Sequence, residues 1–88
     1  MSPSSHRLVS NLISDLKQER DEIALQIHLA KQEAQDRWAD LQGKLTELED
    51  RFEPVKDAVE ETGEDVWDAL KLLGSEIKDG FRRVRDAI

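Results

Sequence analysis

Apolar side chains recur every three or four residues from Val9 to Val59, interrupted in the first half by the charged Arg20. This spacing places the apolar residues on one stripe of an α-helix, and a sustained heptad of this kind is how helices pack along a shared seam. Together with a content of 38% charged residues, it favours amphipathic helices over strands. The chain is therefore predicted to be all-α and, at 88 residues, to form one domain at most.

The first helix is predicted to be long. No proline occurs between Pro3 and Pro54, Gly43 is the one glycine in that interval, and good helix formers dominate it. At Ala34 the apolar rhythm takes one additional four-residue step, a stutter that unwinds a supercoil locally without ending the helix. We predict a disordered N-terminus over residues 1–7 and one heptad helix over 8–52.

Two positions could end this helix. Pro54 lacks an amide hydrogen and disfavours helical backbone at the preceding residue, so the chain could turn at 52–54. Gly63 offers a second turn, at 62–64. The first alternative is favoured because a fold-back there brings basic residues near the C-terminus close to acidic ones in the first helix. It would also bring Trp38 to Trp67.

A second helix over 53–88, with a bend near 62–64, is expected to form an antiparallel hairpin with the first. Its apolar residues repeat at a distance of eleven, which is close to the natural period of an α-helix and keeps the stripe straight. The members of this stripe are Val66, Leu70, Leu73, Ile77, Phe81, Val84 and Ile88.

A two-helix hairpin covers only one side of each stripe, so we expect two copies to pair into a four-helix bundle. Leu25 and Leu29 lie off the main seam and widen the apolar face. The alternative is one nearly continuous helix in a long coiled coil, kinked at Pro54. The residues predicted to form the self-association interface are Ile13, Leu16, Ile23, Ile27, Trp38, Leu41, Leu45, Leu48, Phe52, Val59, Val66, Leu70, Leu73, Ile77, Phe81 and Val84.

No residue pattern points to catalysis or to a cofactor. His6 and His28 are far apart in the sequence, and neither has a second histidine or a cysteine at the spacing of a zinc site. No glycine-rich phosphate-binding motif occurs. We therefore expect a non-enzymatic protein without cofactor or metal, acting as a scaffold or protein-interaction module.

A net charge of −7 opposes binding to nucleic acid, since that affinity depends on neutralising phosphates. The sequence has no apolar run typical of a signal peptide or of a membrane-spanning helix, which predicts a soluble, cytoplasmic protein. The expected partner is a second copy of the chain or another helical protein. An alternative function is binding to a lipid surface through the amphipathic segment 66–88.

The segment Thr62-Gly63-Glu64-Asp65-Val66-Trp67-Asp68-Ala69-Leu70-Lys71, followed by Gly80-Phe81, resembles a family of small bacterial coiled-coil proteins known as stress-response proteins. The similarity covers roughly residues 30–88, and its distinctive part is the segment around Trp67. The family pattern is a long charged heptad helix followed by amphipathic eleven-residue repeats. The resemblance implies a bacterial, stress-associated protein and no catalytic residues.

Overall fold

The computed structural model describes residues 3–56 and 63–88, with side chains from His6 onward. Within these residues the chain forms the α-helices α1 (Pro3–Ala24), α2 (Gln32–Phe52) and α3 (Glu64–Asp86). A short 3₁₀ helix, η1 (Ile27–Leu29), lies between α1 and α2. No strand occurs in the described residues, so the prediction of an all-α fold is confirmed.

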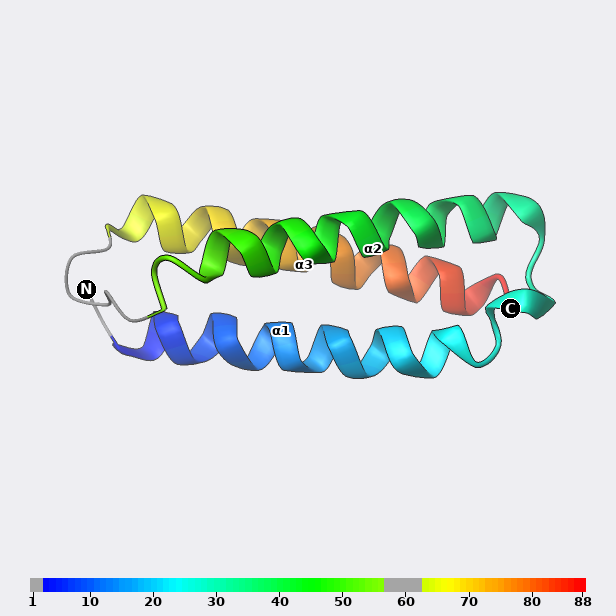
Figure 1. The fold of residues 1–88 in the computed structure, drawn as a ribbon, viewed down its shortest axis with the longest axis horizontal. Helices are drawn as coiled ribbons and strands as arrows, with labels where there is room; N and C mark the ends of the chain where they lie inside the picture. Colours follow the sequence, from blue (N-terminus) through cyan, green and yellow to red (C-terminus); the bar gives the residue numbers. More distant parts are fainter. Residues whose placement is uncertain (1–2, 57–62) are drawn as a thin grey trace.

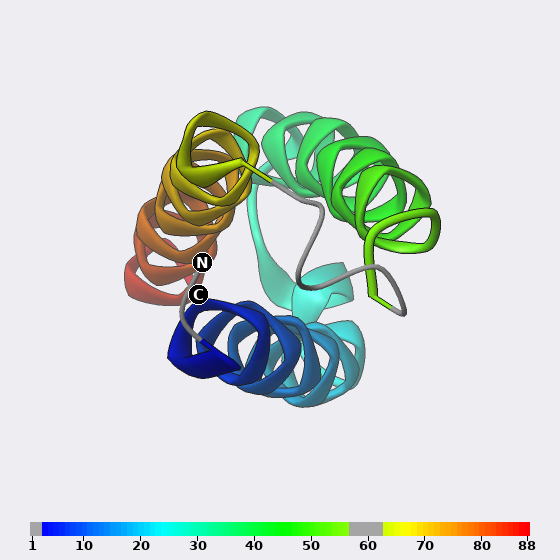
Figure 2. The same ribbon diagram turned by 90° about the vertical axis from the view of Figure 1, so that its left-hand side faces the viewer.

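The helices form a rod of 44 × 17 × 17 Å (Figure 1). Helices α1 and α3 run in the same direction and α2 runs antiparallel to both. Viewed along the rod, the helices stand at the corners of a triangle, and α3 packs against both α1 and α2 (Figure 2). The apolar face of α3 is accordingly the most completely buried, because two neighbours cover it.

Each helix buries one heptad stripe, as a three-four spacing of apolar residues requires. The stripes meet in a single core, and Trp67, Ile77, Phe81 and Val84 of α3 are fully buried in it. The other members of the core are Val9, Ile13, Leu16 and Ile23 from α1, Trp38, Leu41, Leu45 and Leu48 from α2, and Leu70 from α3.

The prediction of one helix over 8–52 is wrong, because the chain reverses direction over residues 25–31, here called the hinge. A short connection costs little loop-closure entropy. It allows α1 to cover α3 within the same chain, whereas a continuous helix would need a second copy to do so. The fold is therefore a three-helix bundle instead of a hairpin of two long helices.

The hinge is held by a few hydrogen bonds. Backbone amides of Leu29 and Ala30 donate to the carbonyls of Gln26 and Ile27, at 2.9 and 3.0 Å. The side-chain amide of Gln35, in the first turn of α2, donates to the carbonyl oxygens of Ala30 at 3.1 Å and Ile27 at 3.4 Å. Gln35 thus ties the start of α2 to the hinge that precedes it.

The boundaries of the other elements also differ from the prediction. Helix α1 begins at Pro3, so residues 3–7 are helical and not part of a disordered N-terminus. Helix α2 ends at Phe52, where Pro54 stops it as expected, and α3 begins only at Glu64. The predicted helix over 53–63 is therefore absent at 53–56, and residues 57–62 lie outside the described part of the chain.

The stripe of α3 follows a seven-residue period, not the predicted eleven. Trp67 and Gly74 face the core at the positions assigned to Val66 and Leu73. Val66 is 43% exposed, Ile88 is 37% exposed, and Leu73 is half-buried at the edge. The sequence-based assignment therefore placed Val66 and Leu73 in the core, where the structure has their neighbours Trp67 and Gly74.

The aromatic pairing also differs from the prediction. The ring of Trp38 lies 5.5 Å from that of Phe81, and Trp67 instead lies near Phe52. The expected approach of a C-terminal arginine to the first helix does occur: Arg85 donates to Glu22 at 2.8 Å. It arises from the parallel packing of α1 and α3, not from an antiparallel hairpin.

Two glycines in helix interiors should respond oppositely to alanine. Gly43 has open space around it, so Gly43→Ala should raise the free energy of unfolding by about 0.5–1 kcal/mol through helix propensity.

A methyl group at Gly80 would overlap the buried Leu41, whose Cδ1 would lie 2.8 Å away. We expect Gly80→Ala to lose about 1 kcal/mol net, since overpacking outweighs the propensity gain. Urea denaturation checks both, and a stabilised Gly80→Ala would contradict the close packing of α2 on α3.

Candidate interaction surface

Most of the residues predicted to mediate self-association are buried inside one copy of the chain. The buried members are Ile13, Leu16, Ile23, Trp38, Leu41, Leu45, Leu48, Leu70, Ile77, Phe81 and Val84. Ile27, Phe52 and Leu73 are half-buried against the same core, Val66 is exposed, and Val59 lies outside the described residues. In the folded monomer these side chains therefore contact each other and are not available to a partner.

The strongest apolar exposure occurs at the end of the rod where the hinge and the C-terminus meet (Figure 1). Leu25 is 76% exposed and Leu29 is 67% exposed, both in the hinge. Ile88 is 37% exposed, and together with Leu25 it lines a hollow of about 360 Å³. We call Leu25, Leu29 and Ile88 the hinge-end surface. Exposed apolar side chains that gather at one end of a molecule are a candidate site for binding another protein.

The charged rim of this surface is supplied by the ends of α1 and α3. Glu22 and Arg85 line the same hollow and form the 2.8 Å ion pair that joins the two helices. Both side chains are about half exposed, so the pair contributes little to stability. An apolar centre with a polar rim is the usual anatomy of a protein interface.

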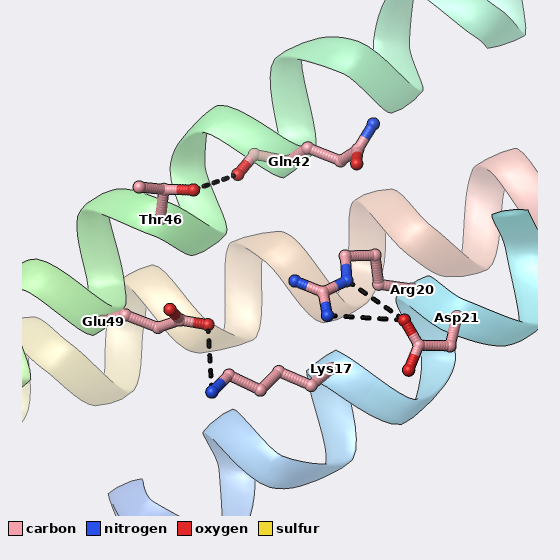
Figure 3. A network of polar contacts seen from close by, with 6 residues as sticks. All are labelled: Lys17, Arg20, Asp21, Gln42, Thr46 and Glu49. Atoms are coloured by element: carbon pink, nitrogen blue, oxygen red, sulfur yellow. Dashed lines mark hydrogen bonds and ion pairs between the residues drawn. The ribbon is translucent and has the colours of Figure 1, made fainter.

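The side of the bundle between α1 and α2 is polar (Figure 3). Lys17 reaches across to Glu49, with 3.5 Å between Nζ and Oε1. At this distance the contact is an ion pair and not a close hydrogen bond, and Glu49 Oε1 has no hydrogen-bond partner among the residues that the structure describes. Arg20 instead pairs with its neighbour Asp21 on the same helix. The side chains that meet between α1 and α2 in this view are charged or polar.

A shallow groove of about 530 Å³ runs between α1 and α3. Leu8, which is half exposed, and the half-buried Leu12 form its apolar part, and Arg7 and Lys78 are among the charged residues that line it. Leu12 lies directly over Gly74, where a Cβ atom would overlap its side chain. The glycine thus lets α1 approach α3 closely along this groove.

The opposite end of the rod is closed by aromatic side chains. The ring of His6 lies 5.4 Å from Phe52 and 5.8 Å from Trp67. Trp67 Nε1 and His6 Nε2 are buried, and within the described residues neither has a hydrogen-bond partner. An unpaired buried N–H costs free energy, which the burial of the indole ring must outweigh.

Within the described residues, no group of three or more His, Cys, Asp or Glu side chains is arranged to hold a metal ion. No helix in that part of the chain carries an apolar stretch long enough to cross a bilayer. Comparison of the chain with known protein families, curated proteins and solved structures gives no match in any of the three.

Sequence reasoning missed the hinge-end surface because it treated Leu25 and Leu29 as a widening of a continuous helix face. A signal was present in the stutter at Ala34. The stripe of α1 ends at Ile23 and that of α2 begins at Ala34 with its own heptad phase. A change of heptad phase at a stutter is compatible with two separate helices as well as with one helix whose supercoil is locally unwound.

Proposed function

We propose that this protein is a non-enzymatic helical interaction module that self-associates through the hinge-end surface and acts as a scaffold in the cytoplasm. The observation that carries the proposal is the exposure of Leu25 and Leu29, which exceeds that of any other large apolar side chain in the described residues. The resemblance of the segment around Trp67 to stress-response coiled-coil proteins supports a stress-related setting.

A second copy of the chain is the proposed partner. The hinge-end surface is small, and two copies related by a twofold axis would each bury the same leucines against the other, as isologous dimers do. Burial of one leucine side chain contributes about 1.5–3 kcal/mol, so four leucines contribute about 6–12 kcal/mol. The free-energy cost of association offsets most of this, and the expected dimer is therefore weak.

The geometry gives less support to lipid binding through residues 66–88. Leu70, Ile77 and Phe81, which would insert into a membrane, are at most 2% exposed in the bundle. Lipid binding would require α3 to leave α1 and α2 and to expose the whole core. Self-association leaves Leu70, Ile77 and Phe81 covered by helices in the final dimer.

Substitution of both hinge leucines tests the proposal. We expect the wild type to form dimers at high micromolar concentration and the double variant Leu25→Lys/Leu29→Lys to raise the dissociation constant by roughly a hundredfold or more. The physical reason is the loss of apolar burial together with the placement of like charges across the twofold axis. Sedimentation velocity over a concentration series measures the effect.

Leu72→Lys is the matched control. Leu72 is 65% exposed on α3, away from the hinge, so its substitution should leave association unchanged. The proposal fails if the wild type remains monomeric at all concentrations, or if Leu72→Lys weakens association as much as the hinge variant.

A further inference from the structure

The hinge reverses the chain without the residues that sharp turns normally use. Residues 25–31 read Leu-Gln-Ile-His-Leu-Ala-Lys and contain neither glycine nor proline. Within the described residues no position has a positive φ angle. Every residue of the hinge can therefore adopt α-helical backbone without steric conflict.

Few backbone angles separate the hinge from a continuous helix. Ala30 and Lys31 have φ of −85° and −67°, already near helical values, with ψ of 160° and 158°. Gln26 has φ of −122° and ψ of −5°. Rotation of ψ at Ala30 and Lys31 to about −42°, with a smaller adjustment at Gln26, would bring these three residues to the backbone angles of a continuous α-helix.

Hydrogen bonding in the closed hinge is incomplete. The backbone amides of Ile27, His28 and Lys31 donate no backbone hydrogen bond within the described part of the chain. In a continuous helix each of them would donate to the carbonyl four residues earlier. A straightened hinge would lose the two hydrogen bonds that the Gln35 side chain donates to the carbonyls of Ile27 and Ala30.

We propose that two copies of the chain exchange α1 by straightening their hinges, which gives a dimer in which residues 3–52 form one helix. This inference rests on the proposed function and specifies how self-association occurs. The contacts of α1 with α3, including Leu12 over Gly74 and Glu22 with Arg85, re-form between copies instead of within one. Because only the hinge changes, exchange of this kind is a low-cost route to a dimer.

The apolar pattern supports the straightened form. Ile23, Ile27, Ala30 and Ala34 continue one stripe through the hinge, so an extended helix keeps its apolar face. Leu25 and Leu29 are one helical turn apart and would lie together on an adjacent face. In the exchanged dimer the two hinges cross near the twofold axis, where the leucines of both copies bury each other.

Lys31→Pro tests the mechanism with little disturbance of the monomer. Proline requires φ near −65° and extended backbone at the preceding residue, and the hinge provides −67° at Lys31 and ψ of 160° at Ala30. In a continuous helix the same proline would be an interior breaker. We expect Lys31→Pro to lower the association constant of the dimer by about ten-thousandfold, because each of its two straightened hinges would carry a proline that costs about 3 kcal/mol, and to leave the melting temperature of the monomer equal or higher.

Two further variants separate the hinge effect from a change of charge. Lys31→Ala removes the same charge without the ring and should dimerise like the wild type. Gln35→Ala removes the side-chain hydrogen bonds that hold the closed hinge and should raise the association constant of the dimer about tenfold. Equal dimerisation of Lys31→Pro and Lys31→Ala would overturn the proposal.

Cross-linking identifies which copy supplies α1. The chain has no cysteine, so the variant Lys17→Cys/Glu49→Cys places one thiol on α1 and one on α2 at facing positions. A short bis-maleimide applied at a concentration where sedimentation shows the dimer should join two chains covalently. Links confined within single chains of a dimer would overturn α1 exchange and leave the proposed function standing. The absence of any dimer would overturn both.

Discussion

Leu45→Asp is expected to unfold the bundle at room temperature or to leave it marginally stable, with a loss of about 4–5 kcal/mol in the free energy of unfolding. Leu45 is 1% exposed in the core. The substitution removes a buried apolar side chain and places a carboxylate where no cation of the core can pair with it. The total stability of a chain of this length is about 4–13 kcal/mol, so the loss is a large fraction of it.

Circular dichroism during urea denaturation measures this loss. Glu33→Ala is the control, because Glu33 is exposed in the first turn of α2 and its removal should change stability by less than about 0.5 kcal/mol. Similar midpoints for the two variants would contradict the burial of the α2 stripe.

Trp67→Ala is expected to cost about 3–5 kcal/mol, since Trp67 is fully buried and its ring contacts those of Phe52 and His6. The cavity left by the indole would lie at the end of the rod opposite the hinge. Thermal unfolding followed by circular dichroism, together with loss of protection in amide hydrogen exchange at that end, checks the result.

Trp67→Phe separates the ring from its N–H group. The indole N–H has no hydrogen-bond partner in the described part of the chain, so phenylalanine keeps an aromatic ring in the core while removing an unpaired donor. We expect a change of less than about 1.5 kcal/mol in either direction. A loss as large as that of Trp67→Ala would mean that the N–H does make an important hydrogen bond.

The sequence was sufficient to predict an all-α fold and the identity of most core residues. Positions such as Leu45, Ile77 and Phe81 were assigned correctly to an apolar stripe because helical periodicity is a local property. Which surface covers each stripe, in contrast, depends on residues far away in the sequence. The same side chains could be covered by a second copy or by another helix of the same chain, and only the position of the turn decides between these outcomes.

The turn itself could not be placed from residue types. Residues 25–31 carry no helix breaker, and their reversal follows from tertiary packing of α1 on α3 and from the brace that Gln35 provides. The stripe of α3 was misassigned for a related reason. A glycine facing the core at position 74 is intelligible only once Leu12 is seen to occupy the space above it.

An odd number of helices also determines how the molecule bears load. Because α1 and α3 are parallel, residue 3 and residue 88 lie at opposite ends of the rod (Figure 1). We expect tension applied between them to pull along the rod axis and to slide the packed side chains of neighbouring helices past one another. A two-helix hairpin held by both of its ends would instead peel open one turn at a time, at lower force.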